Sequence, residues 1–425
     1  MLFNILTILP MLVCGLITMW LLMIQWRYRR RERSWLIAWG VAATMLYACH
    51  AEYFSRPDVA NPYADTIYAV CNLAVYPLYL LYIITLVRGR CPRRGSIALL
   101  LGPAVIGGVA QGILYGMMDS AGAREFNLIF LRNDSMEPLH GVSRLLALWH
   151  VACRIIFAIE VVGVVFAGQY LIRHYDEDIA MNYADTEGRL LTSVRTILWI
   201  LLGISVMSVV ANIIGRHWFS DSTWLLMIPS LAFSLLLSLI GWEGIMYGLA
   251  PTSGETLATS ESLALNADEA QLADGTVPTP VVAEHIRQTL REKKLFLRHD
   301  LRLSDLTEVM HTNRTYLWQA LKESNTTFSD LINTLRIEYA AELIRKQPET
   351  SISNIYVLSG YSSRNSFYRN FHDIMHCTPR EYAARYYLTI TSPQPSPRER
   401  EKLAPQGQQR AAFHRRLARG SKLNA

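Results

Sequence analysis

The sequence is poor in charged residues, which occupy 18% of its 425 positions, whereas an ordinary soluble protein has roughly 25%. Because 51% of the residues are hydrophobic, low-complexity disorder is excluded. The chain has six cysteines, none in a C-x-x-C motif or in a Cys/His pairing with metal-ligand spacing. It also lacks H-E-x-x-H, a P-loop and G-x-S-x-G. We therefore expect no metal site, no disulfide framework, no cofactor and no enzymatic activity.

Charge is distributed unevenly along the chain, although the net charge is only +6. The net charge is +2 over residues 1–250, −5 over 251–280, +3 over 281–390 and +6 over 391–425. The expected fold class is all-α, with a transmembrane bundle followed by a soluble domain. The sequence predicts four parts: a membrane domain (1–250), a flexible acidic linker (251–280), a soluble globular domain (281–390) and a basic disordered tail (391–425).

Residues 1–250 contain seven apolar stretches, each long enough to cross a bilayer core as a helix, which needs about 20 residues. They are 3–26, 35–54, 66–87, 95–118, 145–170, 194–215 and 223–249. The loops after the first, third and fifth stretches contain 11 Arg residues, Arg195 at the start of the sixth stretch adds a twelfth on the same side, and the other loops contain five. The positive-inside rule therefore predicts an outward N-terminus, a cytoplasmic residue 250 and a multi-pass location in the inner membrane.

A few ionisable residues lie inside these stretches, where an unpaired charge costs several kcal/mol. Five of them form a candidate sensor site: His50, Glu52, His150, Arg154 and Glu160. Two interpretations remain open. Either these residues bind a polar signal ligand or respond to protons, or Arg154 pairs with a carboxylate and its role is structural.

From residue 281 onward, the apolar residues recur with the period of amphipathic helices. Residues 303–324 and 351–373 share a helix–turn–helix layout. Asn313 is expected to cap the second helix of the first unit, and Ser362 or Ser363 that of the second, with Gly360 making the turn. A long amphipathic helix, about 328–346, is expected between the two units.

Residues 284–388 resemble the AraC-type DNA-binding domain, in which a connecting helix joins two helix–turn–helix units. The matching positions are Leu306, Tyr316, Leu317, Leu321, Lys322, Phe328, Arg336, Ile337, Ala340, Ile352, Ile355, Gly360, Tyr361, Ser363, Phe367, Phe371, Thr378, Pro379 and Tyr382. Asn325 and His376 occupy positions where that family usually has glycine. The resemblance covers about a quarter of the chain and implies a transcription regulator.

The predicted recognition helices carry residues suited to DNA, because Arg, Asn and Gln in the major groove hydrogen-bond base edges. The expected DNA-binding residues are Arg314, Thr315, Trp318, Gln319, Lys322, Arg364, Asn365, Tyr368 and Arg369. Arg336 is expected to contact phosphate or to remain solvated.

These patterns together predict a membrane-bound regulator that binds double-stranded DNA at a promoter or operator, with the domain in the lipid bilayer acting as the sensor. RNA polymerase, a second copy of the chain and an unidentified signal ligand remain open as partners. The alternative is a membrane transporter or receptor whose helix–turn–helix domain serves only protein interaction or is vestigial.

Overall fold

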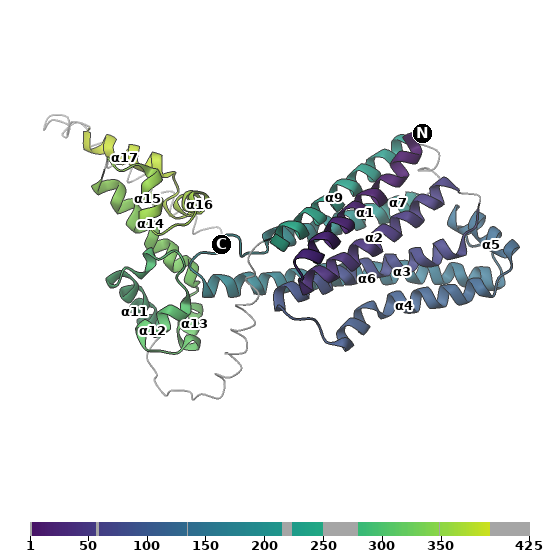
Figure 1. The fold of residues 1–425 in the computed structure, drawn as a ribbon, viewed down its shortest axis with the longest axis horizontal. Coiled ribbons are helices and arrows are strands. Elements are labelled where there is room, and N and C mark those ends of the chain that lie inside the picture. The colour runs from purple at the N-terminus through teal and green to yellow at the C-terminus, as the bar shows by residue number, and fades with distance from the viewer. Residues whose placement is uncertain are drawn as a thin grey trace, which may run out of the picture. The chain divides into compact units, whose positions relative to one another are not determined.

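The computed structural model describes residues 2–56, 59–133, 135–214, 223–249, 279–347 and 349–391. These residues form helices and no strand, so the expected all-α class is confirmed for them (Figure 1). The chain divides into two compact units: residues 1–179 with 188–276, and residues 180–187 with 277–425. The predicted linker, 251–280, and tail, 391–425, fall almost wholly outside the described residues.

The first unit consists mainly of long helices. They are α1 (Leu2–Arg27), α2 (Arg31–Ser55), α3 (Pro62–Arg88), α4 (Arg94–Gly116), α6 (Gly141–Asn182), α7 (Thr192–Ile214) and α9 (Thr223–Leu249), with the short α5 (Ser120–Phe126) and the π-helix η1 (Asn127–Leu131) between α4 and α6. Each of the seven predicted spans overlaps one of the long helices.

Four stretches within these helices are both long and apolar enough to cross a membrane: Ile5–Arg27, Pro62–Arg88, Arg94–Gly116 and Gly141–Asn182. The structure therefore supports four of the seven predicted spans. Helix α2 does not qualify, because Trp35, Trp39, Tyr47 and His50 lower its hydropathy. Helices α7 and α9 extend over 23 and 27 residues, but the apolar stretches found in them are Thr192–Val206 and Ser230–Trp242, so these two predicted spans remain predictions.

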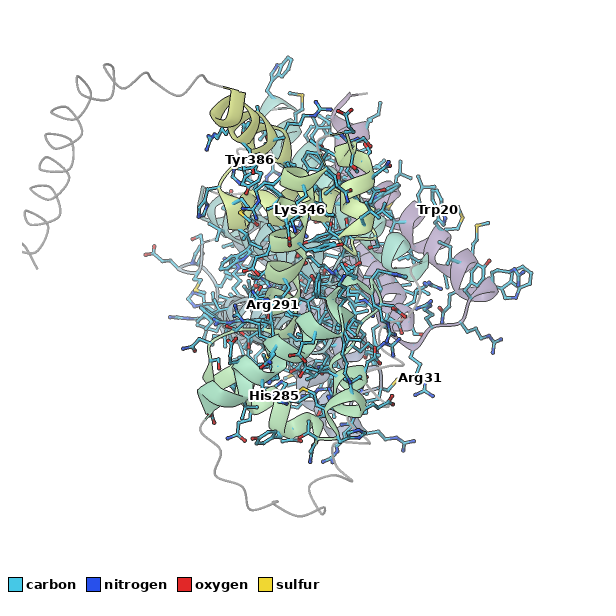
Figure 2. The ribbon with its side chains drawn as sticks, turned by 90° about the vertical axis from the view of Figure 1, so that its left-hand side faces the viewer. Trp20, Arg31, His285, Arg291, Lys346 and Tyr386 are labelled. Carbon is cyan, nitrogen blue, oxygen red and sulfur yellow. The ribbon has the colours of Figure 1, made fainter. Side chains whose placement is uncertain are left out.

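The first four helices of this unit pack in chain order, and its last helix, α9, returns to pack against the first. Helix α1 packs against α2 and α9, α2 against α3, and α3 against α4. Gly108 lets α4 approach α3 closely, because a Cβ at that position would meet Val70 Cγ2 at 2.1 Å. By contrast, Leu16 and Trp20 of α1 are exposed, as expected of a helix that faces lipid (Figure 2).

The second unit consists of shorter helices around two cores. The helices are α11 (Thr279–Glu292), the 3₁₀ turn η2 (Leu295–Leu297), α12 (Leu303–Met310), α13 (Arg314–Glu323), α14 (Phe328–Lys346), α15 (Ile352–Leu358), α16 (Arg364–Met375) and α17 (Pro379–Thr391). An exposed ion pair joins α11 to α14, with 2.7 Å between Arg291 Nη2 and Glu338 Oε2 (Figure 2).

Helix α14 contributes to both cores of this unit, and its bounds match the predicted connecting helix. Its first half places Phe328, Ile332 and Leu335 in the core formed with α11, α12 and α13. Its second half places Ile337 and Ala340 in the core formed with α15 and α16. This helix therefore holds the two helix–turn–helix units in one domain.

Candidate functional site

Helices α13 and α16 are the second helices of the two units, and each begins at a side-chain cap. Asn313 Oδ1 accepts the backbone N–H of Thr315 at 2.8 Å, as predicted. Of the two serines that remained open, Ser363 is the cap, and its Oγ accepts the N–H of Ser366 at 3.5 Å. Since a cap satisfies an otherwise free N–H of the first turn, each recognition helix has a defined start.

The turn before α16 requires glycine. Gly360 has φ +85°, in the left-handed region that costs other residues free energy. A Cβ at this position would also lie 2.7 Å from the carbonyl oxygen of Leu297. Gly360 therefore allows the backbone of the turn before α16 to pack closely against η2.

Helix α13 presents the first set of predicted DNA contacts. Thr315, Gln319 and Lys322 are exposed, and the Gln319 amide donates to Glu323 Oε1 at 2.8 Å. Trp318 departs from the predicted outward face, because it packs partly against the first core. Lys322 Nζ lies 4.4 Å from the centroid of the Trp318 ring. Arg314 is half-buried.

Helix α16 presents the second set. Arg364, Asn365 and Arg369 are exposed, while Phe367 and Phe371 anchor the opposite face in the core. The guanidinium Cζ of Arg364 lies 5.2 Å from the ring centroid of the half-buried Tyr368. This helix therefore presents three planar or bidentate donors on one face, the residue types that read base edges.

Arg336 is not a surface residue, contrary to the sequence-based expectation. It is 1% exposed, and its Nε and Nη2 donate to the carbonyl oxygens of Phe296 at 2.7 Å and Arg298 at 2.6 Å. Burial lowers the pKa of this guanidinium, while the nearby Tyr361 and Asp185 favour its charged form. The residue therefore ties α14 to η2 and is too deeply buried to contact phosphate.

The two positions at which the resemblance implied glycine adopt the left-handed conformation that glycine favours. Asn325 follows α13 with φ +50°, and His376 follows α16 with φ +54°. Both positions are therefore left-handed, as the resemblance implied, although neither residue is glycine.

Sequence comparison identifies this part of the chain. A family profile described as "Helix-turn-helix domain" matches residues 306–385, which contain both recognition helices. Residues 306–385 are an AraC-type helix–turn–helix domain.

In related proteins, too, the residues similar to this AraC-type domain make up only part of the chain. An "Uncharacterized HTH-type transcriptional regulator" of Staphylococcus aureus is 33% identical over 100 residues, which are 23% of this chain and 13% of that protein. The "TCP pilus virulence regulatory protein" of Vibrio cholerae is 35% identical over 81 residues, 19% of this chain and 29% of that protein. The similarity is thus confined to the domain. No solved structure matches the chain.

The AraC-type domain shares its compact unit with residues 180–187, which comprise the C-terminal end of α6 (180–182) and the first part of the loop that leads to α7. Arg314 donates to Asn182 Oδ1 from Nε at 3.1 Å and from Nη2 at 2.6 Å. Beyond Asn182, Ser362 donates to Asp185, and Ser366 Oγ donates to Glu187 Oε2 at 2.6 Å. The sequence analysis missed this segment, because no local pattern marks it as part of the domain.

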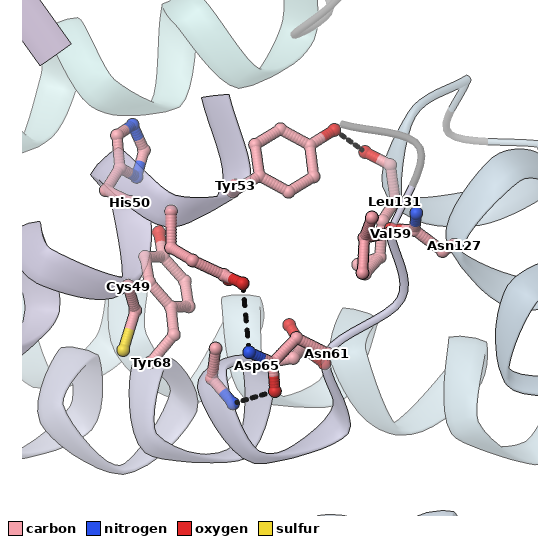
Figure 3. Close-up of a pocket in the computed structure, with 11 residues that line it drawn as sticks. Cys49, His50, Tyr53, Val59, Asn61, Asp65, Tyr68, Asn127 and Leu131 are labelled. Atoms are coloured by element: carbon pink, nitrogen blue, oxygen red, sulfur yellow. Dashed lines mark hydrogen bonds between the residues drawn. The ribbon is translucent and has the colours of Figure 1, made fainter. Parts of the chain in front are cut away.

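The first unit contains a polar pocket between α2, α3 and the α5–η1 region (Figure 3). It is a cavity of about 40 Å³, and His50, Glu52 and Asp65 are among its lining residues. Glu52 Oε1 accepts from Asn61 Nδ2 at 2.9 Å, and the Tyr53 hydroxyl donates to the Leu131 carbonyl at 3.0 Å (Figure 3). Such a volume holds a few water molecules, well below the roughly 300 Å³ of an ordinary ligand pocket.

Asp65 joins three helices at the edge of this pocket. Its Oδ2 accepts from Gln111 Nε2 at 2.7 Å and from the Tyr115 hydroxyl at 2.8 Å, both on α4. His150 Nε2 on α6 lies 3.0 Å from the same oxygen. The sequence analysis missed Asp65, which immediately precedes the third predicted span, although an acid beside a buried stretch was a usable signal.

The remaining predicted sensor residues lie outside the pocket lining. Arg154 Cζ lies 5.4 Å from the ring centroid of Phe130, whose ring also contacts that of His150. Both carboxylate oxygens of Glu160 are buried without a hydrogen-bond partner among the described residues. The structure thus places His50 and Glu52 with Asp65 around the pocket and His150 beside Asp65. Glu160 lies apart.

Proposed function

We propose that this chain is a membrane-anchored transcription regulator that binds double-stranded DNA sequence-specifically through its AraC-type domain. One observation carries the proposal: two capped recognition helices expose Arg, Asn and Gln side chains in a chain that also has four helices able to cross a membrane. The relatives named as HTH-type and virulence regulators support it. The domain would act from the cytoplasmic face of the inner membrane, where DNA is accessible.

Within this proposal, the two recognition helices divide the contacts. Gln319, Asn365 and Arg369 are exposed and of the types that read base edges, so we assign them to base recognition. Lys322 and Arg364 provide positive charge for phosphates. Trp318 and Tyr368 offer apolar surface to sugars and thymine methyl groups. Arg314 and Thr315 lie at the start of α13.

Genome-wide mapping with the full-length protein tests the proposal. After crosslinking in living cells, precipitated DNA should contain a common sequence, and Gln319→Ala or Arg369→Ala should reduce enrichment there. Each base contact is worth about 1–3 kcal/mol, so affinity should fall roughly 5- to 150-fold. Lys293→Ala is the matched control, because this exposed residue lies outside both recognition helices. Enrichment without a common sequence, or unchanged by these substitutions, would refute sequence-specific binding.

We further propose that the polar pocket of the membrane domain is where the signal acts. Its small volume suits water, a proton or a small ion better than an organic ligand. The titratable groups that face it or adjoin Asp65 come from four helices: Cys49, His50, Glu52 and Tyr53 (α2), Asp65 and Tyr68 (α3), Tyr115 (α4) and His150 (α6). Since Asp65 contacts both α4 and α6, a change in its charge alters how three helices pack.

A reporter fused to a mapped promoter tests this role. Output should change between mildly acidic and neutral external pH, and Asp65→Asn should abolish the change without altering the amount of protein in the membrane. Glu125→Gln is the control, because this acid on α5 does not line the pocket. A wild-type output that is independent of pH, or an Asp65→Asn variant that still responds, would exclude proton sensing at this pocket.

A further inference from the structure

Residues 181–187 are part of the core of the AraC-type domain's unit, although they comprise the last two residues of the membrane-domain helix α6 and the start of the loop to α7. Met181 is 6% exposed and Ala184 is 1% exposed, and both belong to the core around α13 and α14. The Ala184 N–H donates to the Leu301 carbonyl at 3.0 Å, and Ser329 Oγ donates to the Ala184 carbonyl at 3.2 Å. Because both backbone groups of Ala184 are paired, the segment is docked in a defined register.

A second pair of contacts strengthens this docking. Tyr183 and Arg302 form an antiparallel bridge, and the Arg302 Cζ lies 5.6 Å from the centroid of the Tyr183 ring. Arg302 immediately precedes α12, the first helix of the first helix–turn–helix unit. The segment therefore binds beside the start of that unit through both backbone and side chain.

The polar side chains of the segment reach the starts of both recognition helices. Asn182 accepts two hydrogen bonds from Arg314, the first residue of α13. Asp185 accepts from Ser362, just before the α16 cap, and Glu187 accepts from Ser366 in the first turn of α16. One short segment thus occupies donors on both helices.

The side-chain donors that the segment occupies are of the kind that commonly bind DNA. Hydroxyl and guanidinium groups at the N-terminal end of a helix bind phosphate, because the free N–H groups and the helix dipole favour negative charge there. In helix–turn–helix proteins, the N-terminal residues of the recognition helix also contact base edges. Two carboxylates and an amide oxygen now accept these hydrogen bonds, so the segment presents DNA-like acceptors to the domain.

We propose that residues 181–187 bind the recognition-helix N-termini in competition with operator DNA, and that DNA binding requires their release. This inference rests on the proposed DNA-binding function. Because the segment is covalently continuous with α6 and α7, a change in how these helices pack acts on it directly. The competition then supplies a route from the membrane domain to the DNA-binding surface that needs no diffusible messenger.

The first test compares variants of the full-length protein in lipid nanodiscs. Binding of a fluorescent duplex that carries the mapped site is measured by anisotropy. The double variant Asp185→Ala/Glu187→Ala should bind about tenfold more tightly, because two charge-assisted hydrogen bonds no longer compete with phosphate. Glu177→Ala is the control, because Glu177 is paired with Arg173 on α6 and should leave affinity unchanged.

The second test needs no substitution. Hydrogen exchange at the Ala184 amide, which is bonded to Leu301, should accelerate when the duplex is added to the wild-type protein. If DNA binds and this amide stays protected, or if the double variant binds no more tightly than the wild type, competition is refuted while DNA binding stands. If neither protein binds the duplex and Gln319→Ala changes nothing, the proposed function itself fails, and the competition fails with it.

Discussion

Replacing Arg336 with Met should destabilise the AraC-type domain without removing any contact to DNA. The guanidinium makes two hydrogen bonds to the carbonyls of Phe296 and Arg298, and hydrogen bonds that involve a charged group contribute about 1.5–3 kcal/mol each. Loss of both would cost about 3–6 kcal/mol, but removing a buried charge recovers part of this free energy. We therefore expect a net loss of about 2–4 kcal/mol.

Hydrogen exchange at the amides of α14 in the full-length protein measures this loss. Exchange through opening of the domain should accelerate roughly 30- to 700-fold, since each 1.4 kcal/mol corresponds to a factor of ten. Arg336→Lys should be nearly as harmful, because a single ammonium does not reproduce the fork that joins the two carbonyls. Unchanged protection, together with weaker DNA binding and a smaller salt dependence, would show that Arg336 contacts phosphate and would refute the structural role.

Three further predictions follow from local features. Gly360→Ala should destabilise α16 by more than about 2 kcal/mol, read from exchange in that helix, because φ +85° and the nearby Leu297 carbonyl both exclude a side chain. Cys91, the exposed cysteine between α3 and α4, should react with a membrane-impermeant maleimide only after lysis, and reaction in intact cells would reverse the topology. The Thr378 N–H donates to Glu381 at 2.9 Å, and this bond lowers the Glu381 pKa. The stabilisation of α17 by this hydrogen bond is therefore complete above about pH 4.3 and is lost as pH falls through the lowered pKa of Glu381. Glu381→Gln should remove this pH dependence, measured as the stability of α17 against pH.

Local patterns predicted much of the recognition helices. The cap at Asn313, the turn at Gly360 and the bounds of α14 all depend on residues close together in sequence, so periodicity and capping rules were sufficient to find them. For the cap of α16 the same rules left two adjacent serines as alternatives, and the structure shows Ser363. Hydropathy likewise located the long helices of residues 1–250. It could not establish how many of them cross a bilayer, because α2 has intermediate polarity.

The all-helical class, the tandem helix–turn–helix arrangement and the residue types on the recognition helices follow from the sequence alone. Which polar groups meet depends on the tertiary structure. It buries Arg336 against two carbonyls, gathers Gln111, Tyr115 and His150 around Asp65 and joins residues 181–187 to the starts of both recognition helices. Such contacts join residues as many as 179 positions apart. No local preference specifies them, because their free energy arises from burial and hydrogen bonding that exist only once the helices have packed.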